Sequence, residues 1–336
     1  MKTQKKKIEL PLTEPLYSTY HYQGPGTAVL VSNSSIRNWY LNHIMILTCT
    51  PKFLNGFTTP EISIAESAWN DNPYFDKKWY DMQFLEGHLH FVIRKLLDAG
   101  YYVCYGGIDD YYVKGKSFYH ERHLDHDGCI CGYDQEAKTY CIYAYDQNWI
   151  YQKFWTSQKS FEAGRKALSK KGHHGGIWGI KPQKDQVFFA HETALAKLSE
   201  YLDSNMSKYP ETAEGTISGI VVHDYIAKYV GMLYDGSIPY EKMDWRVFRV
   251  IWEHKKVMLE RITLIEDALS INHTISETYR SVVREADNCR ILYAAHHMKQ
   301  RNALLPTIQK KLLTLRNLEQ ELLNELLVTA QGMEKK

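Results

Sequence analysis

The chain has 336 residues, 44% hydrophobic and 24% charged, the balance of a soluble globular protein, and its formal net charge of +2 argues against nucleic acid as the main partner. No apolar run of about 18 residues occurs and the start, MKTQKKKIELPL, lacks the apolar region of a secretory signal, so we expect neither a membrane span nor secretion. The six cysteines form no CxxC pair, and we expect a cytoplasmic chain with reduced thiols.

The first 60 residues are mixed, and SSIRNWYLNHIMILTC within them fits either a helix or a strand. EGHLHFVIRKLLDAG (86–100) has apolar residues at helical spacing and a glycine after its end, which predicts a helix. YYVCYGG predicts a strand, and residues 126–146 predict a hairpin. SQKSFEAGRKALSKK (157–171) predicts a helix with a serine cap, GIWGIKP a short strand, and HETALAKLSEYLDS (191–204) another helix.

From about residue 215 the pattern changes to long amphipathic helices. DWRVFRVIWEHKKVMLERITLIEDAL, with Asp244 as its expected cap, carries a near-heptad apolar stripe. The last helix repeats that stripe at Leu305, Ile308, Leu312, Leu315, Leu322 and Leu326. We therefore predict an α+β fold class, with an α+β domain over 1–212 and an all-α helical bundle over 213–336.

The hairpin HLDHDGCICGYDQEAKTYCIYAYD raises the question of catalysis. A turn centred on Glu136 places His126 opposite Asp146 on one face of the hairpin. Cβ atoms of such a pair lie roughly 4.5–5.5 Å apart, which allows a carboxylate–imidazole hydrogen bond of the kind that orients a catalytic histidine. The alternative is a pair of solvated hairpin ends. The same register puts Cys131 opposite Cys141 on the other face, as small buried side chains.

Several segments resemble a known family. YYVCYGGIDDYYVKGKSFYHERHLDHDGCICGYD, the tyrosine-rich strand after it and SFEAGRKAL resemble the N-terminal domain of the butirosin biosynthesis protein H family. DWRVFRVIWEHKKVMLERI has a close counterpart in family members found beside non-ribosomal peptide synthetases. The resemblance implies a papain-like N-terminal domain. It also implies an accessory enzyme of natural-product assembly that transfers an acyl or peptidyl group from a carrier-protein thioester to a small-molecule or peptide acceptor, or to water.

The resemblance maps the family's histidine and aspartate onto His126 and Asp146. In a papain-like enzyme a cysteine thiolate attacks the thioester, the histidine activates it and the aspartate orients the histidine. Residues 18–45, where that cysteine is expected, contain none, and Cys49 in LTCTPKF is the nearest candidate nucleophile. Cys49 as a structural thiol is the alternative. Without a thiol, His126 acts directly as general base, or the domain is a non-catalytic module that binds a carrier protein or peptide.

Two further patterns remain open. RHLDHDG contains HxxxDG, the core of the peptide-synthetase condensation motif HHxxxDG, with His123 as the working histidine; this reading also gives acyl transfer. Glu253 and His254 in WEHKK form a candidate metal half-site, with a solvated charged helix face as the alternative. No GxGxxG or Walker motif occurs, and we expect no cofactor.

Overall fold

The structure, a computed structural model, is described for residues 6–20, 23–55, 59–65, 69–204 and 215–334. The chain forms two compact units, one of residues 1–37 with 68–187 and the other of residues 38–67 with 188–336. The predicted domain boundary, between 212 and 213, lies outside the described residues. The units found are interleaved along the chain, because an early segment contributes strands to the later, mainly helical unit.

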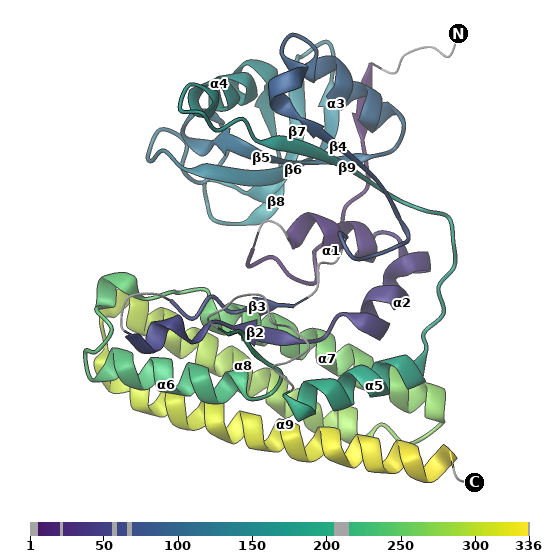
Figure 1. Ribbon diagram of the computed structural model, residues 1–336, viewed down its shortest axis with the longest axis vertical. Coiled ribbons are helices and arrows are strands. Elements are labelled where there is room, and N and C mark those ends of the chain that lie inside the picture. The colour runs from purple at the N-terminus through teal and green to yellow at the C-terminus, as the bar shows by residue number, and fades with distance from the viewer. Residues whose placement is uncertain (1–5, 21–22, 56–58, 66–68, 205–214, 335–336) are drawn as a thin grey trace. The chain divides into compact units, whose positions relative to one another are not determined.

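The first unit is built on an antiparallel sheet with the strand order β4-β9-β5-β6-β7-β8, to which β1 adds by pairing with β6 (Figure 1). Its strands are β1 (Lys7–Glu9), β4 (Phe75–Asp81), β5 (Tyr102–Asp109), β6 (Asp125–Asp134), β7 (Thr139–Tyr145), β8 (Tyr151–Ser157) and β9 (Gly176–Pro182). Its helices are α1 (Gly24–Val31), η2 (Met82–Leu85), α3 (Leu89–Asp98), η3 (Asp110–Tyr112) and α4 (Gln158–Ser169).

Helices α3 and α4 lie on one face of this sheet and close its hydrophobic core (Figure 1). Ile93 and Leu97 of α3 and Phe161 of α4 are fully or almost fully buried there. The burial of the α3 residues confirms the apolar spacing predicted for that helix. The predicted cap of α4 is also confirmed, because Oγ of Ser157 accepts a hydrogen bond from the amide of Ser160.

The predicted hairpin exists as β6 and β7, but its register changes part-way along. A turn centred on Glu136 would pair Ile130 with Ile142 and Gly132 with Tyr140. Ile130 does pair with Ile142, but Gly132 pairs with Cys141. Cys131 is the extra residue between these two registers, so it forms a β-bulge. Its Sγ lies 3.6 Å from that of Cys141, and both thiols are free and buried.

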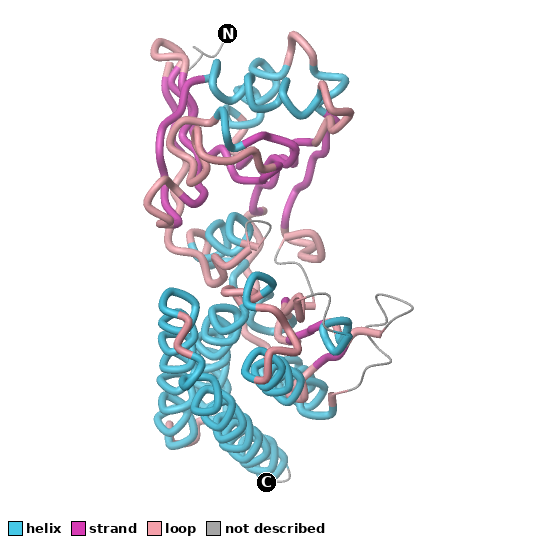
Figure 2. The backbone as a smooth tube through the Cα atoms, turned by 90° about the vertical axis from the view of Figure 1, so that its left-hand side faces the viewer, coloured by secondary structure: helices cyan, strands magenta, loops and turns pink. Residues whose placement is uncertain are grey.

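The second unit is mainly helical. Its elements are β2 (Leu47–Cys49), η1 (Pro51–Asn55), β3 (Ser63–Ile64), α5 (His191–Asp203), β10 (Ile217–Ser218), α6 (Val222–Tyr234), η5 (Tyr240–Lys242), α7 (Val247–Leu269), α8 (Thr274–Lys299), η6 (Asn302–Leu304) and α9 (Leu305–Glu334). A further helix, α2 (Ser34–His43), contains the division between the units at residue 37. The small sheet has the order β10-β2-β3, and the long helices α7, α8 and α9 lie side by side (Figure 2).

The helices of the second unit match the sequence prediction closely. All six residues of the stripe predicted in α9 are buried. The stripe predicted in α7 is buried except for Leu269 at its end; its members are Phe248, Ile251, Met258, Ile262, Ile265 and Leu269. Asp244 does not cap α7 through its side chain; its carboxylate accepts from the amide of Arg246 in the turn before the helix. Among the described residues, every helix is too short or too polar to cross a bilayer.

Candidate functional site

Two histidine–aspartate pairs meet where β5 ends. Asp109 closes the strand and Asp110 opens η3, and both carboxylates are fully buried. Nδ1 of His123 lies 2.8 Å from Oδ2 of Asp109, and Nδ1 of His126 lies 2.7 Å from Oδ2 of Asp110. Asp109 has an extended backbone, in which successive side chains point in opposite directions, so the two neighbouring carboxylates serve two different histidines.

A bulge in β5 sets this geometry. β5 and β6 pair regularly as far as Tyr105 and Gly128, and the register then shifts so that Ile108 faces His126. Gly107 lies inside the shift with φ of 80°, and a Cβ there would come within 2.4 Å of a backbone atom in the loop before β9. Only glycine fits that position. Bulges re-aim the side chains that follow them, and this one precedes both aspartates.

Lys116 gives the Asp110–His126 pair a buried counter-charge. Its Nζ lies 3.2 Å from Oδ1 of Asp110 and donates to the carbonyl oxygen of Asp127 at 2.8 Å. Burial of Asp110 opposes its ionisation, but the charge of Lys116 and the hydrogen bond from His126 outweigh that effect and lower the pKa of Asp110. At neutral pH His126 is therefore held by an ionised carboxylate.

Asp146 does not hold His126, and the predicted pairing of these two residues is wrong. One oxygen of Asp146 accepts from the amides of Asn148 and Ile150, and the other accepts from Gln152, so the carboxylate fixes the turn between β7 and β8. The reason lies in the strand pairing. Asp146 forms a β-bridge with Lys116, whereas His126 pairs with Ile108 of β5, so the hairpin ladder does not reach these ends.

Cys49 belongs to the second unit and is a structural thiol. It lies on β2 between β3 and β10 and is 1% exposed. Burial raises the pKa of Cys49 to about 12, so the thiolate that attacks a thioester is scarcely populated at neutral pH. The predicted nucleophile is contradicted, and the alternative reading of a buried structural cysteine fits.

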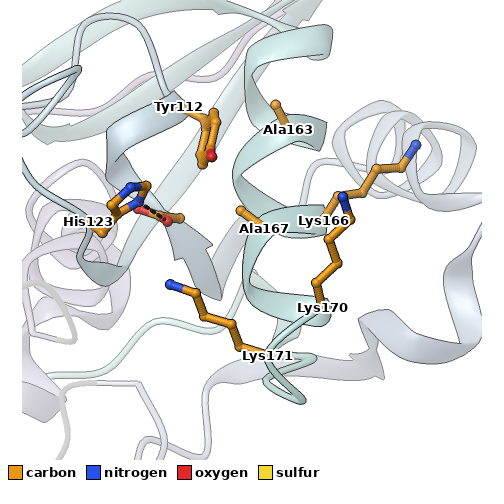
Figure 3. A pocket seen from close by; sticks show the side chains of 8 residues that line it. Tyr112, His123, Ala163, Lys166, Ala167, Lys170 and Lys171 are labelled. Carbon is orange, nitrogen blue, oxygen red and sulfur yellow. Dashed lines mark hydrogen bonds and ion pairs between the residues drawn. The ribbon is translucent and has the colours of Figure 1, made fainter.

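A pocket of about 510 Å³ lies between η3, the Asp109–His123 pair and α4 (Figure 3). The His123 imidazole stacks on the ring of Tyr111 at 4.3 Å between centroids, and about half of the histidine side chain is exposed. In Figure 3 the Lys171 side chain extends from the end of α4 toward the side of the pocket that holds His123. The lining residues are Asp109, Tyr112, His123, Ala163, Lys166, Ala167, Lys170 and Lys171.

Sequence reasoning missed both aspartates of the site. Asp109 and Asp110 stand next to each other in GGIDDYY, 14 and 16 residues before the histidines they hold. The available signal was a glycine pair followed by two acidic residues at a strand end, a pattern typical of a bulge that re-aims side chains. His123, considered only through the condensation motif, is the histidine that lines the pocket.

The candidate metal half-site is not assembled. His254 is fully buried and its Nε2 lies 2.8 Å from the carbonyl oxygen of Met45, while Glu253 pairs with Arg249. Over the described part of the chain, no group of three or more His, Cys, Asp or Glu side chains has a metal-binding arrangement. No protein-family model matches the chain, and no curated protein matches it in sequence.

Proposed function

We propose that the first unit is an acyl- or peptidyl-transfer enzyme of natural-product assembly, with His126 as general base. The observation that carries this proposal is the Asp110–His126 pair, a 24% exposed imidazole held by a fully buried, ionised carboxylate. A buried carboxylate fixes the tautomer of a catalytic histidine and stabilises the imidazolium that forms during reaction. The resemblance to the butirosin biosynthesis protein H family supports the same assignment. The proposal includes a papain-like fold for this unit, which the resemblance also implies.

The partner in this proposal is a cytoplasmic acyl- or peptidyl-carrier protein that presents a thioester. With the Nδ1 proton of His126 donated to Asp110, proton transfer runs through Nε2. Nε2 removes the proton of the acceptor amine or alcohol as that group attacks the thioester carbonyl. The carbon–sulfur bond then breaks, and the imidazolium returns the proton to the departing thiolate.

This route needs no protein thiol, which agrees with the cysteines of the chain. All six cysteines are buried, and the most exposed, Cys104, has 8% of its surface accessible. Helix α1, which lies in the stretch where the family cysteine is expected, contains no cysteine. The same observation favours a second candidate, a non-catalytic module on this fold that binds a carrier protein or peptide.

A turnover assay separates the two candidates. Acyl- and peptidyl-carrier proteins are loaded with acyl groups, mixed with amine acceptors, and followed by mass spectrometry of the carrier and the product. We expect turnover by the wild type, loss of turnover in His126→Ala, and retention in Cys49→Ser. A wild type that binds the loaded carrier but never transfers the acyl group would support the binding module and reject the enzyme.

A further inference from the structure

We infer that the pocket between α4 and the Asp109–His123 pair is a second ligand site, which binds the phosphate group of a small organic phosphate ester. The inference does not depend on the proposed acyl transfer, because it concerns a different histidine and is tested by binding. It rests on three features of the described residues: uncompensated positive charge, an oriented imidazole, and a pocket of ligand size.

The positive charge comes from the end of α4. Lys170 and Lys171 line the pocket, and the side chain of neither forms an ion pair or hydrogen bond with any other described residue. Lys166 also lines it, but its charge is partly offset by Glu162 at 3.6 Å. Lysines at a helix C-terminus also complement the helix dipole. That role accounts for their sequence position but leaves the ammonium group of Lys171, which extends toward the His123 side of the pocket (Figure 3), available to an anion.

His123 supplies a donor with a fixed direction. Asp109 is already satisfied by the amides of Tyr111 and Leu124, and it accepts the Nδ1 hydrogen bond of His123 in addition. This arrangement holds the imidazole in place, while across the described residues no hydrogen bond reaches its Nε2. With Nδ1 of His123 held by Asp109, Nε2 is the ring nitrogen left to hydrogen-bond a phosphate oxygen, and a hydrogen bond to that charged group is charge-assisted.

The remaining walls of the pocket favour an ester with an organic part. Ala163 and Ala167 lie one turn apart on α4, and the Tyr112 ring stands on the opposite side (Figure 3). Their small and aromatic side chains leave apolar surface beside the charged end. The volume of about 510 Å³ lies within the range of small-molecule sites and is far larger than a phosphate ion needs.

Calorimetric titration with 4′-phosphopantetheine, the group that a carrier protein bears, tests the site against pantetheine, which lacks the phosphate. We expect 4′-phosphopantetheine to bind and pantetheine to bind at least tenfold more weakly, since hydrogen bonds to charged groups contribute about 1.5–3 kcal/mol. Affinity should fall as salt rises, because the lysines are exposed. A second titration uses adenosine 3′,5′-bisphosphate, a free nucleotide, to distinguish a carrier arm from a soluble phosphate ester.

The matched variants are Lys171→Gln and His123→Gln, which alter the pocket, and Lys159→Gln, which removes an exposed lysine of the same helix outside it. The first two should weaken 4′-phosphopantetheine binding about tenfold each, while Lys159→Gln leaves it unchanged. Circular dichroism checks that every variant is folded.

Binding of either phosphate ester with this variant pattern supports the site, and the preferred ester identifies its source. The inference is overturned if neither ester binds at millimolar concentration, if pantetheine binds as tightly as its phosphate, or if Lys159→Gln weakens binding as much as Lys171→Gln. Loss of acyl transfer alone, with phosphate binding intact, would reject the proposed function and leave this site standing.

Discussion

The first and second units each bury a cluster of charged side chains. The clusters differ in whether any member is exposed to solvent. In the first unit the buried carboxylates of Asp109 and Asp110 hold histidines that are 53% and 24% exposed. In the second unit Lys255 of α7 and Glu319 of α9 form a 2.7 Å ion pair, with His223 of α6 at 3.7 Å, and all three are fully buried.

This difference separates reactive groups from structural ones. An accessible imidazole on a buried carboxylate can exchange a proton with a bound ligand. A fully buried set has no route to a ligand, but it links the helices that contribute to it. Glu319 also accepts hydrogen bonds from Tyr201 of α5 and Tyr279 of α8, so side chains from five helices meet at one carboxylate.

The largest effect is expected on catalysis in the first cluster. Asp110→Asn removes the charge that orients His126, and the acyl-transfer rate should fall about 10²- to 10⁴-fold. Asp146→Asn, at the residue that fixes only a turn, should keep the rate within about threefold of wild type, since local contacts away from the reacting groups contribute little. Equal losses in both variants would contradict the assignment of Asp110.

The second cluster should respond in stability instead. Lys255→Met leaves the Glu319 carboxylate buried without its cation and should lower the free energy of unfolding by about 3–5 kcal/mol in urea titrations. The double variant Lys255→Met/Glu319→Met should recover part of that loss. Lys256→Met, at the exposed neighbouring position, is the control and should stay within about 0.5 kcal/mol. If Lys255→Met lowers the free energy of unfolding by no more than Lys256→Met does, the Lys255–Glu319 pair does not stabilise the bundle.

As the pH is lowered, the second unit should lose stability at pH values above those at which ordinary carboxylates become protonated. Burial, helped by the charge of Lys255, lowers the pKa of His223 from 6.5 to about 3 and that of His254 well below its usual value. Between pH 6.5 and about 3 the unfolded chain binds protons that the native state does not bind. The free energy of unfolding therefore decreases as the pH is lowered through this range. The slope is about 1.4 kcal/mol per pH unit for each histidine.

Urea titrations at pH 7, 6, 5 and 4 measure this slope in the wild type and in His223→Gln. The variant should lose about half of the histidine contribution, because His254 still titrates. A stability that is flat from pH 7 to 5 would be inconsistent with two buried neutral histidines.

The smallest effect is expected for the stability of the first cluster. His123→Gln replaces a half-exposed side chain by one that still carries a donor, so the free energy of unfolding should change by less than about 1 kcal/mol. A loss as large as that of Lys255→Met would remove the distinction between the two clusters, because His123 would then be a structural residue.

Local pattern predicted the long helices of the second unit and, in the first unit, α3, α4, β5, the β6–β7 hairpin and β9, but not β4 or β8. The heptad stripe of α9, the serine cap of α4 and the existence of the β6–β7 hairpin all depend on residues close in sequence, and the structure confirms them. The α+β class follows from the same periodicities. The hydrogen-bond partner of His126 was not predicted because it depends on two features set by residues far apart in the sequence. These are the β-bulge at Gly107 and the β-bridge between Lys116 and Asp146. Neither leaves a periodic signal in one sequence.

The interleaving of the two units has a consequence for synthesis on the ribosome. β2 at Leu47–Cys49 pairs with β10 at Ile217–Ser218, which is translated roughly 170 residues later. At about 5–20 residues per second, the buried edge of β2 waits on the order of 10–30 s for its partner strand. During that interval the first unit also lacks its last strand, β9, until residue 182 has emerged. The nascent chain therefore carries two incomplete sheets at once, and the helices that cover the smaller one arrive last.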